Sequence, residues 1–270
     1  MNKVRLKSLL LGSVLLLIVA YGAALLWVWL RQERLLFHPE PLAAGHAFDL
    51  GADVHEETLD VPGARLSALH LRLPAPKGVV FFLHGNAGNL ASWFVNADFY
   101  REANFDLYMI DFRGYGKSSG QIDSEAQLRA DVRAAWDQVA PRYQGLKRVI
   151  YGRSLGSGLA AGLAAQVAPD LTILVSPYSS MQALAHEHYP FVPSALLRYP
   201  LRTVDDAARL HGPVLLVHGD RDLVVPPHHS TDIQTVAPQA KLLRIPAAGH
   251  GDLQDFEVYR QALRAALAAL

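Results

Sequence analysis

The sequence predicts an α/β domain built on a mostly parallel sheet with helices on both of its faces. From residue 78 onwards, short apolar runs alternate with longer amphipathic or Ala-rich stretches. Such apolar runs are typical of strands buried on both faces, and the stretches between them fit crossover helices. The chain of 270 residues is 51% apolar, so a large core can form around this sheet.

The first thirty residues predict a membrane-spanning signal anchor. Three cations precede an uncharged run over residues 8–30, long enough to cross a hydrocarbon layer of about 30 Å. A cleaved signal peptide has a shorter apolar region, and the run continues beyond the possible cleavage site at 20–22. Residues 1–30 are therefore predicted to stay attached, with Trp27 and Trp29 at the far interface.

The charges that flank this run predict its orientation. The three cations and the α-amine before the run outnumber Arg31 and Arg34 after it. The positive-inside rule then places the N-terminus in the cytoplasm and the rest of the chain outside it, in the periplasm of a bacterial cell. The charge difference is slight, so the inverted topology is the alternative.

Residues 31–53 contain two prolines and show no periodicity, which predicts a stalk leading into a domain over residues 54–270. The domain is expected to begin with an antiparallel pair of strands, 54–61 and 66–73. Buried strands are then expected at 78–83, 105–110, 149–151, 171–175, 214–217 and 242–245. Helices are expected near 91–103, 124–139, 155–167, after Pro226, and over 252–268. Residues 177–212 contain four prolines and predict a short helical cap insertion beside a substrate pocket.

The pattern Gly-x-Ser-x-Gly occurs twice, and one copy lies directly between a predicted strand and a predicted helix. This copy is GRSLG at residues 152–156, whereas GKSSG at 116–120 lies in a loop. A sharp strand-to-helix turn exposes the serine hydroxyl, so Ser154 is predicted to be the nucleophile in preference to Ser118. The Gly-Lys-Ser of the second copy lacks the earlier glycine of a phosphate-binding loop, because residue 111 is Asp.

Candidates for the general base and its orienting acid follow the last two predicted strands. His250 lies in AGHGD after the last strand, and it combines the right chain order with a loop position at the carboxyl edge of the sheet. Asp220 and Asp222 follow the preceding strand in HGDRD. Asp222 lies deeper in that loop, just before an apolar segment, and is predicted to orient the imidazole, with Asp220 as the alternative.

Two backbone donors are expected beside the nucleophile. Asn86, in the loop HGNAGN after the first buried strand, and Leu155, directly after the nucleophile, are predicted to offer N–H groups to an oxyanion. The histidine pairs at 186/188 and 228/229 could suggest a metal. Because no acidic partner stands at ligand spacing, they are interpreted as solvated, and no metal or cofactor is expected.

The motifs together resemble the α/β-hydrolase superfamily. The segments HGNAGN, DFRGYGKSSG, GRSLGSG, HGDRDLVVP and AGHGD occur in this order over about residues 55–270. The resemblance is nearest to membrane-anchored α/β-hydrolase-domain proteins and to the serine aminopeptidase-like hydrolases. It implies an α/β-hydrolase fold, a triad of Ser154, Asp222 and His250, backbone donors at Asn86 and Leu155, and esters, thioesters or lipid acyl groups as substrates.

The expected function is hydrolysis of a carboxylic ester or thioester through an acyl-enzyme on Ser154, with a lipid-like acyl group suited to the apolar insertion. A serine peptidase is an alternative, although the insertion lacks an acidic cluster to bind a free amine. A catalytically silent binding protein is another, although the order Ser, Asp, His is intact. The zero net charge gives no reason to expect a nucleic-acid partner, and the absence of cysteine excludes thiol catalysis.

Overall fold

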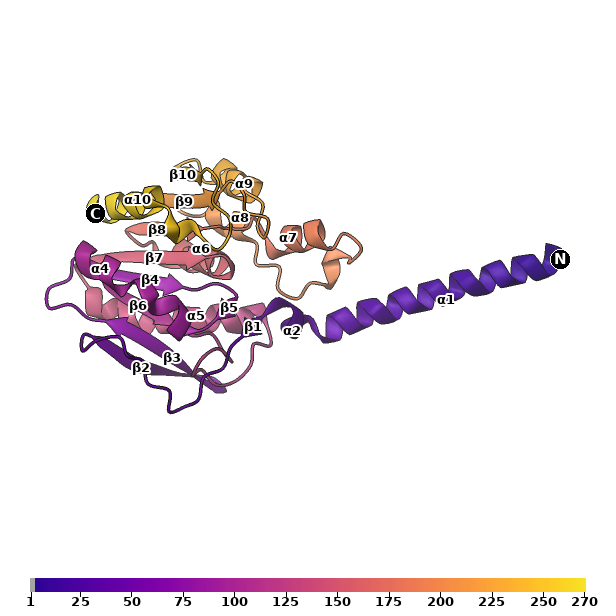
Figure 1. The fold of residues 1–270 in the computed structure, drawn as a ribbon, viewed down its shortest axis with the longest axis horizontal. Coiled ribbons are helices and arrows are strands. Elements are labelled where there is room, and N and C mark those ends of the chain that lie inside the picture. The colour runs from indigo at the N-terminus through magenta and orange to yellow at the C-terminus, as the bar shows by residue number, and fades with distance from the viewer. Residues whose placement is uncertain (1–2) are drawn as a thin grey trace.

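The protein is a layered α/β domain from which one long helix projects (Figure 1). The computed structural model describes residues 3–270. Eight strands form the central sheet in the order β10-β9-β8-β7-β4-β6-β3-β2. Their bounds are β2 Val54–Val61, β3 Ala64–Leu71, β4 Gly78–Leu83, β6 Asp106–Ile110, β7 Lys147–Arg153, β8 Leu171–Val175, β9 Val214–Gly219 and β10 Ala240–Ile245. The pairs β2–β3 and β3–β6 are antiparallel and the others are parallel, which confirms the predicted fold class.

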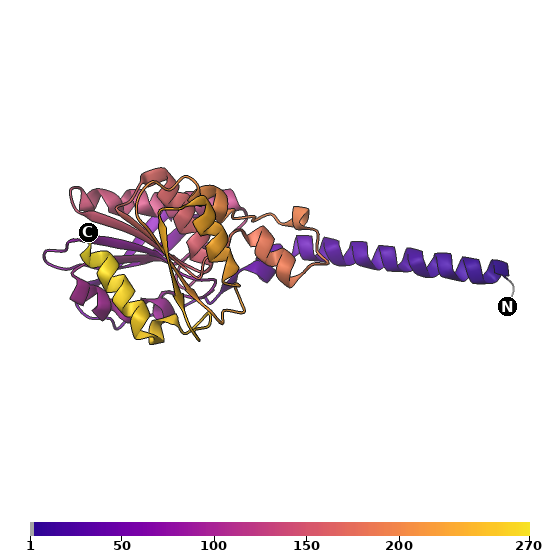
Figure 2. The same cartoon turned by 90° about the horizontal axis from the view of Figure 1, so that it is seen from above.

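Helices cover both faces of the sheet, as the second view shows (Figure 2). One face packs against α5 Glu125–Val139, α6 Leu155–Val167, α8 Thr203–Ala207 and α9 His228–Val236. The other packs against α3 Leu90–Trp93, α4 Ala97–Ala103 and α10 Glu257–Ala268. Strand β4 contributes Phe81 to the first core and Phe82 to the second, which is why its sequence is apolar at every position. Because the strands from β10 to β6 in this order run parallel, their carboxyl ends lie along one edge of the sheet, and the loops that follow them meet there.

The antiparallel edge of the sheet contains a buried polar cluster. Glu57 of β2 faces His70 of β3, with 2.9 Å between Oε1 and Nδ1, and accepts a hydrogen bond of 2.7 Å from Arg142. His70 Nε2 lies 2.7 Å from the hydroxyl of Tyr143. Burial alone would raise the pKa of the Glu57 carboxyl, but the hydrogen bonds with His70 and Arg142 outweigh it and lower the pKa to about 2.

Replacing Glu57 by glutamine is expected to make the free energy of unfolding less sensitive to acid. The wild-type carboxylate has a pKa lowered from 4.5 to about 2, so its contribution is full above about pH 5 and is lost as the pH falls from there toward 2. That shift corresponds to at most about 3 kcal/mol. Urea unfolding at pH 7 and at pH 3 measures it. The gap between wild type and Glu57→Gln should shrink at pH 3, whereas an equal gap at both pH values would contradict the assignment. Glu56→Gln, at the exposed neighbouring position, is the control.

The projecting helix α1, Lys3–Leu30, carries the apolar run predicted from the sequence. Its segment Leu10–Leu30 has 21 residues and a mean hydropathy of 2.3, which is long and apolar enough to cross a membrane. A signal sequence near an N-terminus can also meet these criteria of length and composition.

Residues 31–53, which the sequence predicts to be a stalk, begin with two short elements and continue as irregular chain. They include the short helix α2, Gln32–Leu36, and the strand β1, His38–Pro39, which pairs with β5, Ala87–Gly88. Gln32 is buried, and its Nε2 donates to the carbonyl of Leu196 at 2.9 Å. Contacts with residues distant in sequence hold these two elements in place. Local sequence periodicity could not predict such contacts.

The segment between β8 and β9, which includes the predicted cap insertion 177–212, contains short helical pieces. It contains α7 Met181–His188, the 3₁₀ turn Ser194–Leu196 and α8. In both views α7 and the loop that follows it lie beside the base of α1 (Figures 1 and 2). The piece from α7 to Tyr199 is called the cap below.

Candidate active site

Ser154 stands at a tight turn between β7 and α6. Its φ of 51° is in the left-handed region, which is strained for a residue with a side chain and is typical of a nucleophile elbow. The turn leaves no room for side chains at either flanking glycine. A Cβ on Gly156 would lie 2.1 Å from the Leu83 carbonyl oxygen, and one on Gly152 would lie 2.3 Å from the Gly156 carbonyl oxygen. The glycines of the motif therefore permit the close approach of the turn to β4.

The structure brings Ser154, His250 and Asp222 into one hydrogen-bonded chain. His250 Nε2 lies 3.0 Å from Ser154 Oγ, and His250 Nδ1 lies 2.7 Å from Asp222 Oδ2. Asp222 follows β9 and His250 follows β10, so each group reaches the site from a loop at the carboxyl end of a parallel strand. A proton on Nδ1 is held by the carboxylate, which leaves Nε2 free to accept the proton of the serine hydroxyl.

The carboxylate of Asp222 is fixed on both of its oxygens. Its Oδ1 accepts the backbone N–H groups of Val224 and Val225 at 3.0 and 2.8 Å. Burial alone would raise the pKa of this carboxyl, but hydrogen bonds from His218 and His250 outweigh it, and the pKa lies well below its usual range. Asp222 is therefore a carboxylate at neutral pH.

His218 is a site residue to which the sequence analysis gave no role. It is fully buried, and its Nε2 lies 3.3 Å from Asp222 Oδ2 and 2.8 Å from the Val225 carbonyl oxygen. Its Nδ1 lies 2.6 Å from Ser230 Oγ. This imidazole contacts the same carboxylate oxygen of Asp222 as His250 does. The sequence feature that could have indicated this role is the position of His218 near the end of β9, four residues before Asp222.

The two alternatives that the sequence left open lie outside this chain of hydrogen bonds. Asp220 pairs with Arg244 at 2.6 Å near the surface. Ser118 is buried, donates to the Asp111 carbonyl at 2.7 Å and accepts the Ser67 N–H at 2.8 Å. Ser118 therefore holds its own loop against β3 and does not face His250.

The two predicted oxyanion donors line the same cavity as Ser154. Leu155 is the first residue of α6, where a backbone N–H has no acceptor within the helix. Asn86 is anchored through its side chain, because Nδ2 donates to the Leu36 carbonyl at 2.6 Å and Oδ1 accepts the Tyr115 hydroxyl at 3.0 Å. The side chain thus fixes the loop after β4, and the role of the two N–H groups stays a prediction.

The cavity at Ser154 has a volume of about 990 Å³ and is lined mainly by apolar side chains. One end lies between α2 and the cap, where Leu35, Leu36, Tyr189 and Val224 line it. The other end extends along the face of the sheet that α4 and α10 cover. It is lined there by Phe82, Tyr100, Met109, Tyr151, Tyr259 and Leu263. A cavity of this size accepts an extended apolar group on either side of the nucleophile.

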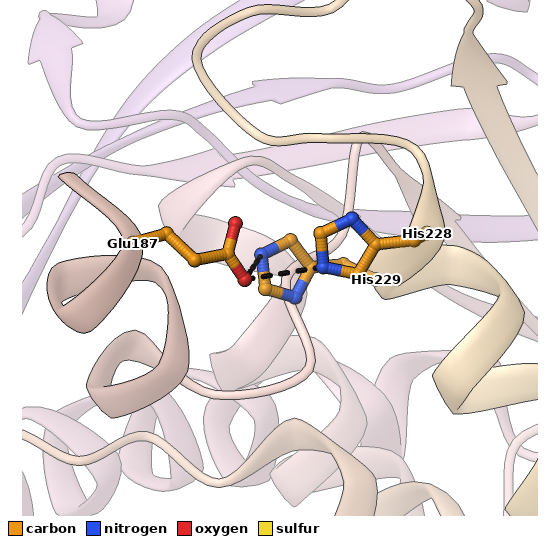
Figure 3. A group of neighbouring side chains, drawn as sticks. All are labelled: Glu187, His228 and His229. Carbon is orange, nitrogen blue, oxygen red and sulfur yellow. Dashed lines mark hydrogen bonds and ion pairs between the residues drawn. The ribbon is translucent and has the colours of Figure 1, made fainter.

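Glu187, His228 and His229 form a separate cluster between α7 and α9 (Figure 3). The interpretation of His228 and His229 as a solvated pair without an acidic partner is right for the exposed His228 but wrong for His229 and for the partner. His229 is fully buried, and Glu187 Oε1 lies 3.1 Å from His228 Nε2 and 3.5 Å from His229 Nε2. The glutamate comes from a helix 41 residues away in sequence, so local spacing could not reveal it.

The cluster could offer three metal-ligand atoms, but the hydrogen bonds of His229 oppose a metal. Its Nδ1 accepts the backbone N–H of Ser179 at 3.2 Å, which places the proton of the neutral ring on Nε2, facing Glu187. A metal-binding histidine has the opposite arrangement, with its second nitrogen donating. Burial lowers the pKa of His229, so the ring is neutral. The cluster is best described as a contact that joins the cap to α9.

The fold and the hydrogen-bonded chain at Ser154 define the class of protein as an α/β-hydrolase. A family model described as serine aminopeptidase, S33, matches residues 74–198, which include Ser154. The chain is 30% identical to alpha/beta hydrolase domain-containing protein 17B of Xenopus laevis over 75% of this chain and 70% of that protein. We conclude that the chain belongs to the α/β-hydrolase superfamily.

Two further comparisons extend over most of the chain. An uncharacterized protein of Mycobacterium tuberculosis is 32% identical over 92% of this chain and 90% of its own length. The structure of an esterase from Pyrococcus furiosus superposes with a TM-score of 0.69 at 18% identity, covering 87% of this chain and 97% of the esterase. The second likeness concerns the fold alone.

Proposed function

We propose that the protein is a membrane-anchored serine hydrolase that cleaves a carboxylic ester or thioester. The observation that carries this proposal is the chain of hydrogen bonds from Asp222 through His250 to Ser154 at the elbow. The esterase among the structural neighbours and the apolar cavity support an acyl substrate.

The reaction begins when His250 Nε2 takes the hydroxyl proton of Ser154 while Oγ bonds to the substrate carbonyl carbon. The N–H groups of Leu155 and Asn86 stabilise the oxyanion that forms. The tetrahedral species collapses, the bond to the alcohol or thiol breaks, and His250 returns its proton to that leaving group. Water then attacks the acyl-serine ester by the same steps, with His250 again as base, and releases the carboxylic acid.

A peptidase and a silent scaffold are the competing functions. The description of the matching family model favours an aminopeptidase, but such an enzyme needs a carboxylate to bind the free amine of a peptide. The one acidic side chain of α7, Glu187, already contacts His228 and His229, and the two carboxylate residues that line the cavity, Glu40 and Asp255, lie outside the cap. A silent scaffold is less consistent with a Ser154 hydroxyl that stands at hydrogen-bond distance from a correctly supported imidazole.

A panel of p-nitrophenyl esters with acyl chains of two to sixteen carbons, assayed beside aminoacyl-anilides, tests the proposal. We expect ester turnover, with kcat/KM rising with chain length because the apolar cavity extends on both sides of Ser154. Anilides should be cleaved at least about a hundredfold more slowly. Preference for an aminoacyl-anilide would establish the peptidase instead, and the absence of turnover on every substrate would favour the scaffold.

The N-terminal helix is proposed to anchor the hydrolase domain outside the cytoplasm, as the flanking charges predict. In a bacterial cell, protease added to spheroplasts should degrade the domain without lysis, and a phosphatase fused after Leu270 should be active. Protection of the domain, together with an inactive fusion, would show the inverted topology. Release of a shortened soluble chain would show that residues 20–22 are cleaved and that the helix is a signal peptide.

A further inference from the structure

Three sets of contacts fasten the cap to α1 and to the short helix α2 that follows it. The hydroxyl of Tyr21, within α1, donates to the Phe191 carbonyl at 2.6 Å. Gln32 donates through Nε2 to Leu196 and accepts the Arg198 N–H through Oε1, at 2.9 and 2.5 Å. The third set joins Glu33 to the guanidinium of Arg198 at 2.6 Å and to the hydroxyl of Tyr199 at 2.7 Å. The cap loop over residues 189–197 is therefore held in a fixed position against the helix.

The position of Tyr21 sets the depth of this loop. Tyr21 lies within the candidate span Leu10–Leu30, nine residues before its end. At 1.5 Å per residue, this corresponds to about 14 Å along the helix axis. If the helix spans a membrane and leaves it at Leu30, the carbonyl of Phe191 lies inside the membrane, at the depth of Tyr21 and within the leaflet on the side of the domain.

The composition of the loop agrees with that depth. Residues 189–197, with the sequence YPFVPSALL, contain no charged side chain. Tyr189 and Phe191 are 65% and 81% exposed, which is a poor arrangement in water for side chains of this size.

The backbone of the loop also has few polar groups to bring into a lipid environment. Pro190 and Pro193 have no N–H, and the N–H of Val192 donates to the Tyr189 carbonyl at 2.9 Å. The N–H groups of Leu196 and Leu197 are bonded to carbonyls of the same loop. Irregular backbone at membrane depth is tolerated where it is buried in protein, so insertion of this loop requires both its internal hydrogen bonds and its contacts with the anchor helix.

We infer that the cap loop 189–197 inserts into the leaflet beside α1 and opens the Ser154 cavity directly to it. Tyr189 belongs both to the loop and to the lining of the cavity, and Leu35 of α2 lines the cavity on the anchor side. The substrate is then a long-chain acyl ester held in the bilayer, whose chain enters between α2 and the cap without crossing water. This inference rests on the proposed ester hydrolysis and on the anchor.

The full chain reconstituted into phosphatidylcholine vesicles allows a direct test. The sequence has no cysteine, so Phe191→Cys offers a single site for a nitroxide label. We expect the label to be more accessible to dissolved oxygen than to a water-soluble nickel complex. Leu146→Cys is the matched control, because Leu146 is also an exposed apolar residue but lies before β7, at the opposite edge of the sheet. Its label should show the reverse accessibilities.

A second measurement links insertion to turnover. Phe191→Asp should lower hydrolysis of p-nitrophenyl palmitate in vesicles at least tenfold and leave hydrolysis of dissolved p-nitrophenyl butyrate unchanged, since Phe191 does not line the cavity at Ser154. Leu146→Asp should change neither rate. A Phe191 label as accessible to the nickel complex as the Leu146 label would overturn the inference, as would an equal loss on both esters. Failure of the proposed function is distinguishable, because it would abolish both ester activities in the wild type and leave the label accessibilities as expected.

Discussion

Ser154→Ala is expected to lower ester turnover by about a millionfold and to abolish covalent labelling by a fluorophosphonate probe. Both follow from the loss of the one hydroxyl that lies at 3.0 Å from His250 Nε2. The remaining donors and the cavity would leave only a small residual rate over water. Gel-based labelling measures the first consequence and p-nitrophenyl ester kinetics the second. The variant should fold normally, because a small side chain at the elbow is removed without exposing the core.

Ser118→Ala is the control for this experiment, since Ser118 stands in the second copy of the same motif. Its hydroxyl bridges β3 and the loop after β6, so the variant should lose about 1–3 kcal/mol of stability but keep its label. Thermal unfolding beside the labelling assay separates the two effects. Labelling that persists in Ser154→Ala protein and disappears in Ser118→Ala protein would transfer the nucleophile to the other motif.

The central strands and the loops that follow them could be predicted from the sequence for a physical reason. Strands buried on both faces are mostly apolar, so β4 is visible as an uninterrupted apolar run, and β6 and β7 as shorter runs that follow charged residues at their starts. Once the strands are placed, parallel order brings every loop after a strand to one edge. The positions of Ser154, Asp222 and His250 in the site then follow from topology, without any knowledge of distances.

Contacts between segments far apart in sequence could not be predicted in this way. Glu187 meets His229 across 42 positions, and neither residue has a local pattern that indicates the other. Gln32, in the segment predicted to be a stalk, is buried against a loop more than 160 residues away. His218 begins the visible motif HGDRD, but its contact with Asp222 depends on the path of the loop between these two residues.

Asp222→Asn is expected to lower kcat by about ten thousandfold, and the hydrogen bonds of the site show why. The two backbone N–H groups of Val224 and Val225 point at Oδ1, so an asparagine at this position would keep its carbonyl oxygen there. Its NH₂ group would then face His250 Nδ1, where the carboxylate oxygen lies at 2.7 Å in the wild type. A donor in that place forces Nδ1 to accept.

The proton of His250 must then lie on Nε2, which can no longer take the proton of Ser154. Asp220→Asn is the matched control, because Asp220 is two residues away and pairs with Arg244 near the surface, where an ion pair contributes at most about 1 kcal/mol. That variant should keep kcat within about twofold.

Steady-state kinetics on a short-chain p-nitrophenyl ester, with circular dichroism to verify folding, compares the two variants. A large loss in Asp220→Asn with near-normal turnover in Asp222→Asn would assign the orienting role to the other carboxylate, and similar losses in both would mean that the loop after β9, not one carboxylate, controls the position of His250.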